Sequence, residues 1–588
     1  MYTVSDKYKV SMNQMLREKS EVNIVFGLIS QDAPSASTPT DNGHTEYSQV
    51  ATFDVGTQVN ETTETLEKNR FFLDGVCKLP TRGEFPFQGY VGNELSGDDK
   101  LYTNIPTVTI TFSQPLEFVA FTLRFDEIKG DYPEILGLKA YNNNVEVLNK
   151  TYNPTGVEFI TPEQIPTCNK IVLEYRKSHF PRRRARIFQL LYGIIVTVTN
   201  KDLTSMTISN KTELLSMELP SQTMEFTMMD MDGEFDPENP NSKLKYFEQG
   251  QFAETSLKQT LYDGSIETIP LSKTYFNGEV TTDRDILGTN LTIKTSTQFD
   301  WLDTEYNGAL YYANGRSYYD LITDALTFAG YSGAYQIDNT LKTKTTKVVL
   351  SGKSVKEFIQ TVANAGGCYI RFDRTGQMIV KPFESNVADV EYSLSTMYGY
   401  PTLNRTALLR NIVTKYVNVS LETSAELASL EVTSVVNQPC TITFDSATNV
   451  TYSVSGVTVV GTPVITANKI EVVLNGTGKI TVTGNKLKYT DVQYVKQVNQ
   501  LGYDLETSNP LIDSRAMCDV YSTNLANYYS KRNSYEFEHR GFPETDVMDS
   551  TVFDTQDYLS ETGIVIENTI TFDGTLSAKT KVLSNSTK

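Results

Sequence analysis

The run Gly352-Lys353-Ser354 contains the residue types that a nucleotide-binding protein uses to hold phosphate. In a phosphate-binding loop the lysine meets the phosphates, the serine meets magnesium, and a further glycine stands five residues before the run. Lys347 occupies that position here. Because Ser354 can also cap a helix that starts directly after it, we interpret the run as a helix start. The sequence therefore predicts no bound cofactor.

Three aspartates, Asp230, Asp232 and Asp236, surround Gly233. A calcium-binding loop places oxygen ligands at alternating positions, a glycine at the sixth position and a bidentate glutamate at the end. Here the glycine is fourth, counted from Asp230. The spacing favours a solvated turn over a bound ion, and we assign no metal ligands.

The sequence contains no motif typical of an enzyme active site. It has three histidines and no His-Glu-x-x-His motif, which argues against a zinc peptidase. The cysteines are odd in number and form no Cys-x-x-Cys pair, so we expect reduced thiols and no zinc site. We predict that the chain is not an enzyme and assign no catalytic residues. The cysteines are Cys77, Cys168, Cys368, Cys440 and Cys518.

Four aromatic residues in a loop-rich stretch could contact a carbohydrate. A sugar ring can stack on an aromatic side chain, because the aromatic ring presents a large apolar face. The same side chains could instead hold loops against a core. We keep sugar contact as an alternative. The four residues are Phe85, Phe87, Tyr90 and Tyr102.

The densest basic patch is the run Arg182-Arg183-Arg184 together with Arg186. Contact with nucleic acid requires clustered basic residues of this kind. The flanking apolar residues instead indicate an edge strand, on which Arg184 and Arg186 would point to the same side. In a chain with a net charge of −19 we expect these arginines to pair with carboxylates, within a subunit or between subunits. No specific nucleic-acid binding is predicted.

The composition indicates a β-rich chain of several domains. Its 588 residues exceed the roughly 250–300 that one hydrophobic core can organise. The abundance of tyrosine and threonine favours strands over helices, because both side chains suit a pleated, half-buried surface. No stretch approaches the roughly 18 apolar residues of a membrane-spanning helix, and the first twenty residues lack the apolar core of a signal peptide. We expect no membrane span and folding in the cytoplasm.

Two helices and a hairpin are predicted in the middle of the chain. The first helix begins at Ser317, carries apolar residues at helical spacing and stops at Gly330. The second begins with Ser354 and Glu357, which form a capping box. A hairpin with its turn at residues 374–376 should follow. This unit is expected to be a helix packed on a small sheet.

Strand patterns predict two further β-modules. Alternating segments between residues 107 and 175 are typical of a β-sandwich. Residues 422–487 contain few charges and several short Val/Ile/Thr runs separated by Asn-Gly and Ser-Gly, which predicts a small immunoglobulin-like module. A last helix is predicted from Pro510, after Asn509, to about Ser530.

One stretch of the sequence resembles the hub proteins of phage tail baseplates and tail tips. Residues 219–227 read LPSQTMEFT, and residues 231–240 read MDGEFDPENP. Hubs of phages and phage-like tail particles carry a similar order of turn and strand residues. The sequel at 245–251, the unit at 354–381 and the ending at 535–543 are similar to the family as well.

The resemblance implies a mainly β fold with some α+β, in which small β-barrel-like hub domains are interrupted by inserted modules. Residues 180–193 resemble the end of the galactose-binding-like β-sandwich that is often inserted into these hubs. The expected domains are a first part of the hub domain (1–78), the inserted galactose-binding-like β-sandwich (79–194), the continued hub β-barrel (195–310), an α+β hub domain (311–421), the immunoglobulin-like module (422–487), and a C-terminal helix with hub β-barrel strands (488–588).

The function that the resemblance implies is a structural one. Such a hub is a homotrimer whose two barrel-like domains per subunit form a pseudo-sixfold ring that adapts the sixfold tail tube to the threefold tip or spike. The implied partners are tail tube, distal tail, spike or tip, and tape-measure proteins. The implied location is the virion tail, after folding in the host cytoplasm. The alternatives are a tail adhesin that binds a host-surface glycan and a tail-associated cell-wall hydrolase, which is less expected because the chain stops at Lys588 without a peptidase region.

Overall fold

The structure, a computed structural model of the chain, is mainly β. Its buried apolar residues form five separate core clusters, as expected for a multidomain chain. None of the helices in the described part of the chain is long and apolar enough to cross a membrane. The structure describes residues 2–14, 16–46, 48, 62–63, 67, 77–78, 89–212, 218–284, 288–350, 352–382, 390–557 and 559–584.

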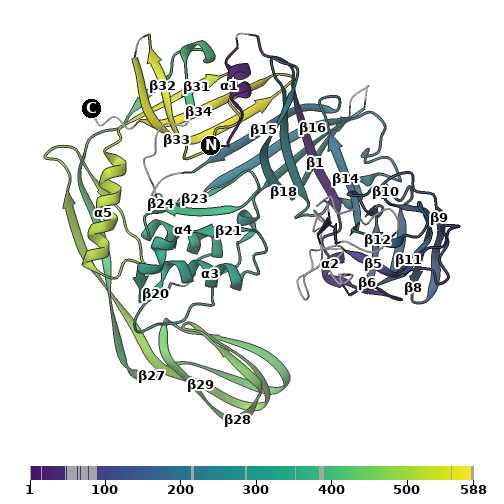
Figure 1. The fold of residues 1–588 in the computed structure, drawn as a ribbon. Coiled ribbons are helices and arrows are strands. Elements are labelled where there is room, and N and C mark those ends of the chain that lie inside the picture. The colour runs from purple at the N-terminus through teal and green to yellow at the C-terminus, as the bar shows by residue number, and fades with distance from the viewer. Residues whose placement is uncertain are drawn as a thin grey trace.

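The largest element is a 13-stranded sheet that both ends of the chain build together (Figure 1). Its main path runs through β14 (Gly193–Val198), β1 (Ser20–Ile29), β17 (Phe252–Thr260), β18 (Ile266–Arg284), β19 (Thr289–Ser296), β16 (Ser221–Asp230), β15 (Leu203–Lys211), β33 (Leu559–Phe572), β34 (Leu576–Ser584), β31 (Asn533–His539) and β26 (Thr402–Arg405). Two further strands, β32 (Ser550–Gln556) and β25 (Val390–Tyr392), extend it beside β33. We call the strands from β14 to β16 the first half-sheet, and β15 with all the later strands the second half-sheet.

One hydrophobic core spans both half-sheets. The side chains of β16 alternate between core and surface, because Met224, Phe226 and Met228 are buried in this core while Glu225 is exposed. The N-terminal helix α1 (Asp6–Asn13) also belongs to it, since Tyr8 is fully buried. Residues far apart in the sequence therefore share a single interior.

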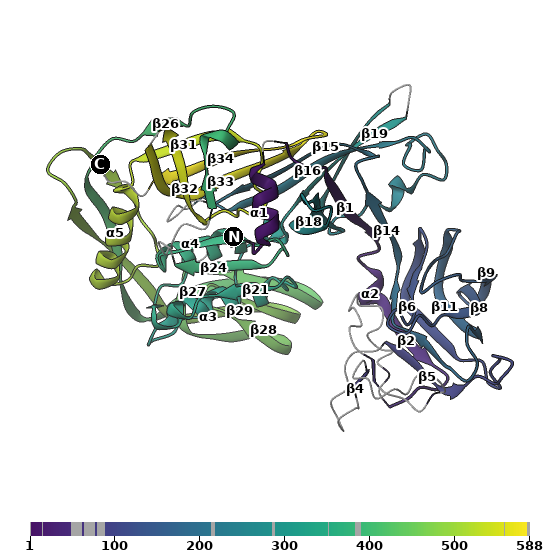
Figure 2. The same cartoon turned by 45° about the horizontal axis from the view of Figure 1, so that its top comes forward.

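A β-sandwich with a core of its own is set apart from the sheet (Figure 2). It contains a five-stranded sheet of β2 (Ser37–Asp41), β6 (Thr107–Phe118), β11 (Ile165–Ser178), β8 (Pro133–Asn142) and β9 (Val145–Tyr152), a three-stranded sheet of β10 (Glu158–Ile160), β7 (Thr122–Arg124) and β13 (Gln189–Leu191), and the pair β12 (Arg184–Ile187) and β5 (Tyr90–Leu95). The sandwich begins earlier than the predicted boundary at residue 79. Helix α2 (Ala33–Ala36) packs on it, and β2 pairs with β6 although its sequence STPTD is typical of a loop.

The predicted helix-and-hairpin unit is confirmed. Helix α3 (Tyr318–Phe328) is capped by Ser317, and α4 (Val355–Ala365) begins with the capping box of Ser354 and Glu357. The hairpin of β23 (Cys368–Phe372) and β24 (Met378–Pro382) follows, and β21 (Tyr335–Ile337) pairs with β24. The short strands β20 (Arg316–Ser317) and β22 (Thr345–Thr346) complete this α+β domain.

The segment predicted to be an immunoglobulin-like module is built differently. Its strands β27 (Leu409–Thr443), β28 (Ala447–Ile465) and β29 (Lys469–Gln497) lie with β30 (Tyr503–Glu506) in one sheet, in the order β28-β29-β27-β30, and not in two packed sheets. Gly456 and Gly476, which we interpreted as turn residues, lie inside continuous strands beside register shifts. Both have positive φ, so they mark bulges that bend long strands.

The last helix, α5 (Arg515–Tyr529), starts later than predicted. Ser514 is its N-cap and accepts a hydrogen bond from the Met517 amide. Asn509, expected at the helix start, is instead buried, and its side chain donates to the Thr361 carbonyl of α4 at 2.8 Å. Asn509 therefore joins the two helical parts of the molecule.

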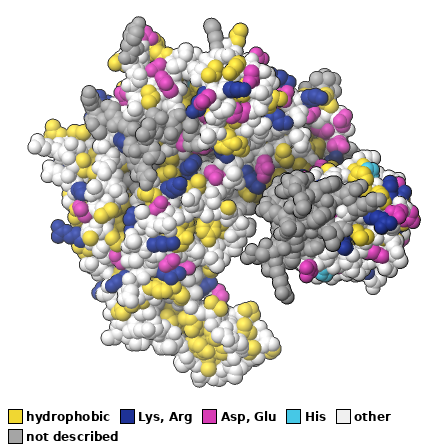
Figure 3. All heavy atoms as spheres, in the orientation of Figure 1, with side chains coloured by type: hydrophobic (Ala, Val, Ile, Leu, Met, Phe, Trp, Pro, Cys, Tyr) yellow, Lys and Arg dark blue, Asp and Glu magenta, His cyan; other side chains and the backbone are white. Residues whose placement is uncertain are grey.

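The parts form an arch whose opening lies between the sandwich and the β27–β29 module (Figure 1). The 13-stranded sheet lies at the top of this view, the sandwich at one end, the α+β domain below the sheet, and the β27–β29 module at the far end. Hydrophobic side chains gather on the module (Figure 3), where Val436 is 81% exposed.

Candidate functional site

Strand β15 lies where the two half-sheets meet. On one side it pairs with β16, with Met206 opposite Phe226, and on the other side it pairs with β33, with Ile208 opposite Ile570. All four side chains are buried in the shared core. Backbone hydrogen bonds therefore fix the two half-sheets to each other within one subunit.

The loop after β16 contains the acidic cluster. Asp230 is 8% exposed, and its carboxylate accepts hydrogen bonds from the backbone amides of Glu234 at 3.2 Å and Phe235 at 2.7 Å. Gly233 has a φ of +72°, a conformation that favours glycine. The predicted turn is present, with Asp230 buried inside it. No group of three or more side chains that could hold a metal ion occurs among the described residues.

Aromatic packing holds the same loop against the first half-sheet. The Phe235 ring lies 5.9 Å from the Phe247 ring, measured between centroids. Phe247 in turn lies 5.2 Å from Phe26 of β1 and 5.6 Å from Phe276 of β18. The stretch that resembles tail hubs therefore forms part of the half-sheet core.

A buried histidine stands in the second half-sheet. His539 is 1% exposed, and its Nδ1 accepts the Gly541 amide while its Nε2 donates to the Thr580 hydroxyl at 2.8 Å. Thr580 in turn donates to Asn568 at 2.9 Å. Burial, together with the nearby Arg17 guanidinium, lowers the pKa of His539 to about 3. The neutral ring therefore links neighbouring strands.

A buried carboxyl group joins the N-terminal helix to the second half-sheet. The Tyr8 hydroxyl of α1 donates to Glu544 at 3.3 Å, and both residues are buried. Burial raises the pKa of the Glu544 carboxyl. Arg17, which follows the helix, donates to the carbonyl oxygens of Met12 at 2.8 Å and Gly541 at 3.0 Å. The first residues of the chain are thus fastened beside its last strands.

Arg374, at the turn of the β23–β24 hairpin, joins the α+β domain to both half-sheets. It is 7% exposed, and its Nη2 lies 2.9 Å from an Asp546 carboxylate oxygen. Its Nη1 donates to the Pro270 carbonyl at 2.7 Å. Pro270 belongs to β18, and Asp546 lies between β31 and β32. One buried side chain therefore connects three parts of the molecule.

The aromatic residues predicted to contact a sugar do not form an exposed platform where the structure describes them. Tyr90 is 0% and Tyr102 is 7% exposed, and both belong to the sandwich core. The Tyr102 ring packs edge-on against Tyr175, with centroids 6.0 Å apart. Phe85 and Phe87 lie outside the described residues. Tyr90 and Tyr102 therefore stabilise the sandwich, because a fully packed ring has no face left for a ligand.

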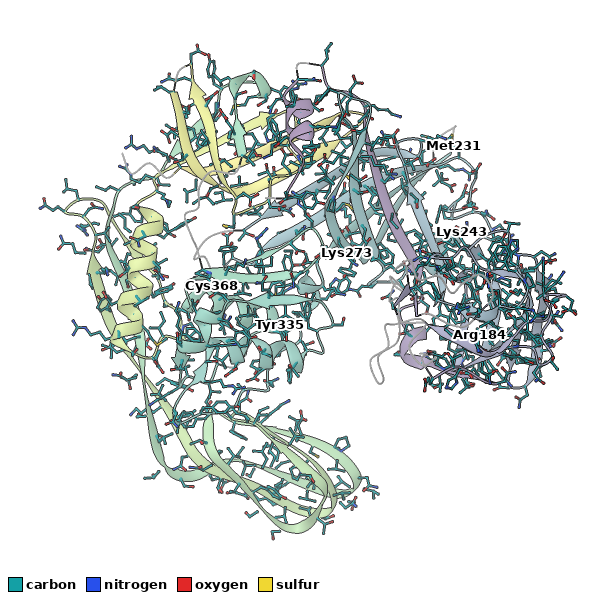
Figure 4. All side chains as sticks on the ribbon, viewed as in Figure 1. Arg184, Met231, Lys243, Lys273, Tyr335 and Cys368 are labelled. Atoms are coloured by element: carbon teal, nitrogen blue, oxygen red, sulfur yellow. The ribbon has the colours of Figure 1, made fainter. Side chains whose placement is uncertain are left out.

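The arginine run of the sandwich has partners within the chain. Arg182 pairs with Asp98 at 2.7 Å, and Arg183, almost fully buried, pairs with Asp131 at 3.3 Å. Arg186 is also buried, and its guanidinium donates to the Glu67 carboxylate. Arg184 lies within the sandwich (Figure 4), where its side chain donates to the Asn93 carbonyl and its backbone amide to Glu67. Ion pairs between subunits stay a prediction for these arginines. The contacts found lie inside one subunit.

Cys168, Cys368, Cys440 and Cys518 are free thiols. Burial raises the pKa of Cys168 and Cys368 to about 12 and that of Cys518 to about 11. These three thiols are therefore protonated and poorly nucleophilic at neutral pH. Cys77 has no described side chain.

Sequence reasoning missed the linking residues Arg374, His539, Glu544 and Asn509. A signal existed only for His539, which continues the inward alternation of Tyr535 and Phe537 in β31. The others lie in turns or loops, where polar residues are ordinary. Their partners come from distant parts of the sequence, so no local pattern indicates them.

The chain is similar to known proteins in structure but not in sequence. No family model matches the chain, and no curated protein matches it in sequence. Among solved structures, the chain is similar to a tail protein from Neisseria meningitidis MC58, with 7% identity and a TM-score of 0.39 over 65% of this chain and 92% of that one. It is also similar to the 43 kDa tail protein of prophage MuSo2 from Shewanella oneidensis, with 11% identity and a TM-score of 0.38 over 67% and 96%. An E. coli component of the type VI secretion system matches with 8% identity and a TM-score of 0.33 over 66% and 74%.

Proposed function

We propose that this chain is a structural hub of a phage or phage-like tail baseplate or tail tip, and that it works as a homotrimer. The observation that carries the proposal is the pair of half-sheets that β15 joins in one subunit. Three such subunits around a threefold axis present six half-sheets, two from each subunit. The six half-sheets suit contact with a sixfold tube on one side, and the threefold axis suits a threefold tip or spike on the other. The hub-like motif lies in one of these half-sheets.

In this proposal the partners are the tail tube, distal tail, spike or tip, and tape-measure proteins, and the location is the virion tail. The net charge of −19 suits a subunit that must stay soluble until it meets them. The sandwich and the β27–β29 module lie away from the β15 junction (Figure 1), so they are free to contact neighbours or a host surface.

Light scattering on the purified chain tests the oligomeric state. We expect a particle of three times the chain mass, or a complex of this size when a tail-tube protein is co-expressed. A monomer at every concentration, with and without the tube protein, would contradict the proposal. A dimer would contradict it as well, because two copies cannot form a threefold ring.

The proposed mechanism is geometric and not catalytic. Zymography on bacterial cell walls tests this part separately. We expect no clearing by the purified chain. Clearing that is abolished by substitution of a single carboxylate would make the chain a tail-associated hydrolase.

A further inference from the structure

A cleft of about 510 Å³ lies where the sandwich meets the first half-sheet. Residues of β14, β1, β17 and β18 line it on one side, and Arg124 of β7 with Gln189 and Leu191 of β13 lines it on the other. This volume is in the range of small-ligand sites, which occur preferentially between domains. Tyr90 and Tyr102, the two described residues that were proposed to contact sugar, do not line this cleft.

The half-sheet side of the cleft carries an aromatic row and a charged row. Phe252 of β17 stands opposite Tyr275 of β18, and Glu254 stands opposite Lys273. All four residues alternate with buried core residues, so they point away from the core and toward the cleft. Lys273 lies on the part of the sheet that faces the opening (Figure 4).

Gly27 of β1 makes room for the aromatic row. A Cβ atom at this position would stand 2.5 Å from the Phe252 ring, so the ring covers the glycine. Tyr275 is half-buried, and its ring is held edge-on by Trp301 with centroids 6.0 Å apart. The two rings thus form a supported apolar surface next to hydrogen-bonding groups.

Two glutamines supply hydrogen-bonding groups to the same cleft. Gln189 is 4% exposed, and its Oε1 accepts a bond from Arg124 at 3.2 Å. Its amide nitrogen bonds to no residue in the part of the chain that the structure describes. Gln298, which also lines the cleft, is half-buried. Because the Gln189 amide nitrogen is not one of the buried atoms that lack a partner among the described residues, it keeps contact with solvent. It borders the cleft, so it can donate a hydrogen bond to a ligand that supplies an acceptor.

The charges in the cleft balance one another. Lys273 Nζ lies 2.7 Å from the Glu254 carboxylate, and although burial lowers its pKa, this carboxylate raises it by more. Arg124 pairs with Glu158 at 3.0 Å. Because each cation already has a carboxylate, the cleft offers no excess charge to a charged ligand.

We propose that this cleft binds a neutral saccharide, stacked on Phe252 and Tyr275 and hydrogen-bonded to Gln189. A sugar ring combines an apolar C–H face with a rim of hydroxyls that both donate and accept, which matches an aromatic surface bordered by amides. The Glu254–Lys273 pair provides an acceptor and a donor at the other border. The site is built from two domains, so the sandwich and the half-sheet both contribute to binding.

A glycan array with the labelled full-length chain tests the proposal, using neutral hexose and N-acetylhexosamine oligomers. We expect the chain to be retained on at least one neutral glycan. A titration of that glycan, followed by saturation-transfer NMR, then measures its affinity for the parent chain and for each variant. Tyr275→Ala should weaken binding at least tenfold, whereas Tyr275→Phe keeps the ring and should bind within about threefold of the parent chain.

Tyr262→Ala is the matched control, because Tyr262 is 50% exposed and lies outside the cleft, and it should leave binding unchanged. If Tyr275→Ala fails to fold, Gln298→Ala replaces it and should also weaken binding. Retention of no neutral glycan, retention of acidic glycans only, or full binding by Tyr275→Ala or Gln298→Ala would overturn the proposal. A trimer that binds no sugar would leave the hub proposal standing.

Discussion

Arg374 reaches both half-sheets from the hairpin of the α+β domain, and its guanidinium is almost fully buried. His539 and Glu544 are buried in the same way and bond to neighbouring strands and to the N-terminal helix. Removing one member of a buried pair leaves its partner uncompensated, which costs more than the pair contributes when intact. At the scale of single residues, stability is therefore concentrated in these few linking side chains.

We predict that Arg374→Met lowers the free energy of unfolding by about 3 kcal/mol, because it leaves the half-buried Asp546 carboxylate without its cation. Asp546→Asn should also destabilise the protein. The double variant should be clearly more stable than the sum of the two single effects indicates. Urea unfolding of the four proteins measures this coupling.

An exposed ion pair supplies the control. Lys579 and Glu536 pair across β34 and β31, and the lysine side chain is 53% exposed. Lys579→Met should cost less than about 1 kcal/mol, as for other surface pairs. Equal effects of Arg374→Met and Lys579→Met would show that Arg374 does not join the domains.

His539 should make stability depend on pH. Its pKa is about 3 in the folded chain and 6.5 ordinarily, so between these values the unfolded chain binds more protons. The histidine therefore destabilises the fold as pH falls below 6.5, by up to about 1.4 kcal/mol per pH unit. Thermal unfolding at pH 7 and pH 5 should show a larger drop for the parent chain than for His539→Gln. Other groups titrate in both proteins, so their effect cancels when the two are compared. An equal drop in stability from pH 7 to pH 5 in the parent chain and in His539→Gln would contradict the prediction.

At the scale of elements, the capping box of α4 stabilises the first turn of that helix. Ser354 accepts the Glu357 amide, and Glu357 accepts the Ser354 amide. Ser354→Ala should lower stability by about 1 kcal/mol. Ser354→Thr keeps the hydroxyl and should cost little, so equal losses in the two variants would contradict the role of the cap. Thermal unfolding measures both.

The elements that sequence reasoning predicted well are those whose signals are local. The caps at Ser317 and Ser354 fix helix starts within a few residues, and both helices were predicted correctly. The β27–β29 sheet was not, because Gly456 and Gly476 serve equally well in turns and in bulges. Strand β2 was missed because its polar residues are held by ladder hydrogen bonds to β6, which composition does not report.

The candidate sites were harder to predict than the elements. Tyr90 and Tyr102 are of a residue type that can stack on a sugar, but both are buried inside the sandwich. Phe252 and Tyr275 meet Gln189 only after two domains pack together. A site assembled from separate domains leaves no spacing in the sequence to recognise.

At the scale of the whole molecule, the β27–β29 module should be separable. Asn485 on β29 donates to the Glu422 carbonyl on β27 at 3.0 Å, so a Gly-Gly turn can join these two residues in place of 423–484. The shortened chain loses two hydrogen bonds to the α+β domain, from the Ala467 amide to the Ala309 carbonyl at 3.0 Å and from Asn468 Nδ2 to Asn307 Oδ1 at 3.2 Å. It also loses the packing of Ala467 in the core of that domain. We predict a folded chain with slightly lower stability.

Light scattering and thermal unfolding of the shortened chain check this prediction. Its oligomeric state should equal that of the full chain, because the module lies away from the β15 junction. A change in oligomeric state would assign the module to the assembly interface. An aggregated product would show that the module is needed for folding.

The pairing of β15 with β33 means that β15 is synthesised long before one of its two partner strands. Ser209 and Thr569 hydrogen-bond across these strands although 360 residues separate them. A ribosome adds roughly 5–20 residues per second, so β15 waits about 20–70 s for its second partner. During that interval one edge of β15 is open to any other nascent strand. Co-expressed chaperones that shield this edge should therefore raise the yield of folded subunits more than slower growth of the expressing cells does. A chain that ends before β33 should aggregate.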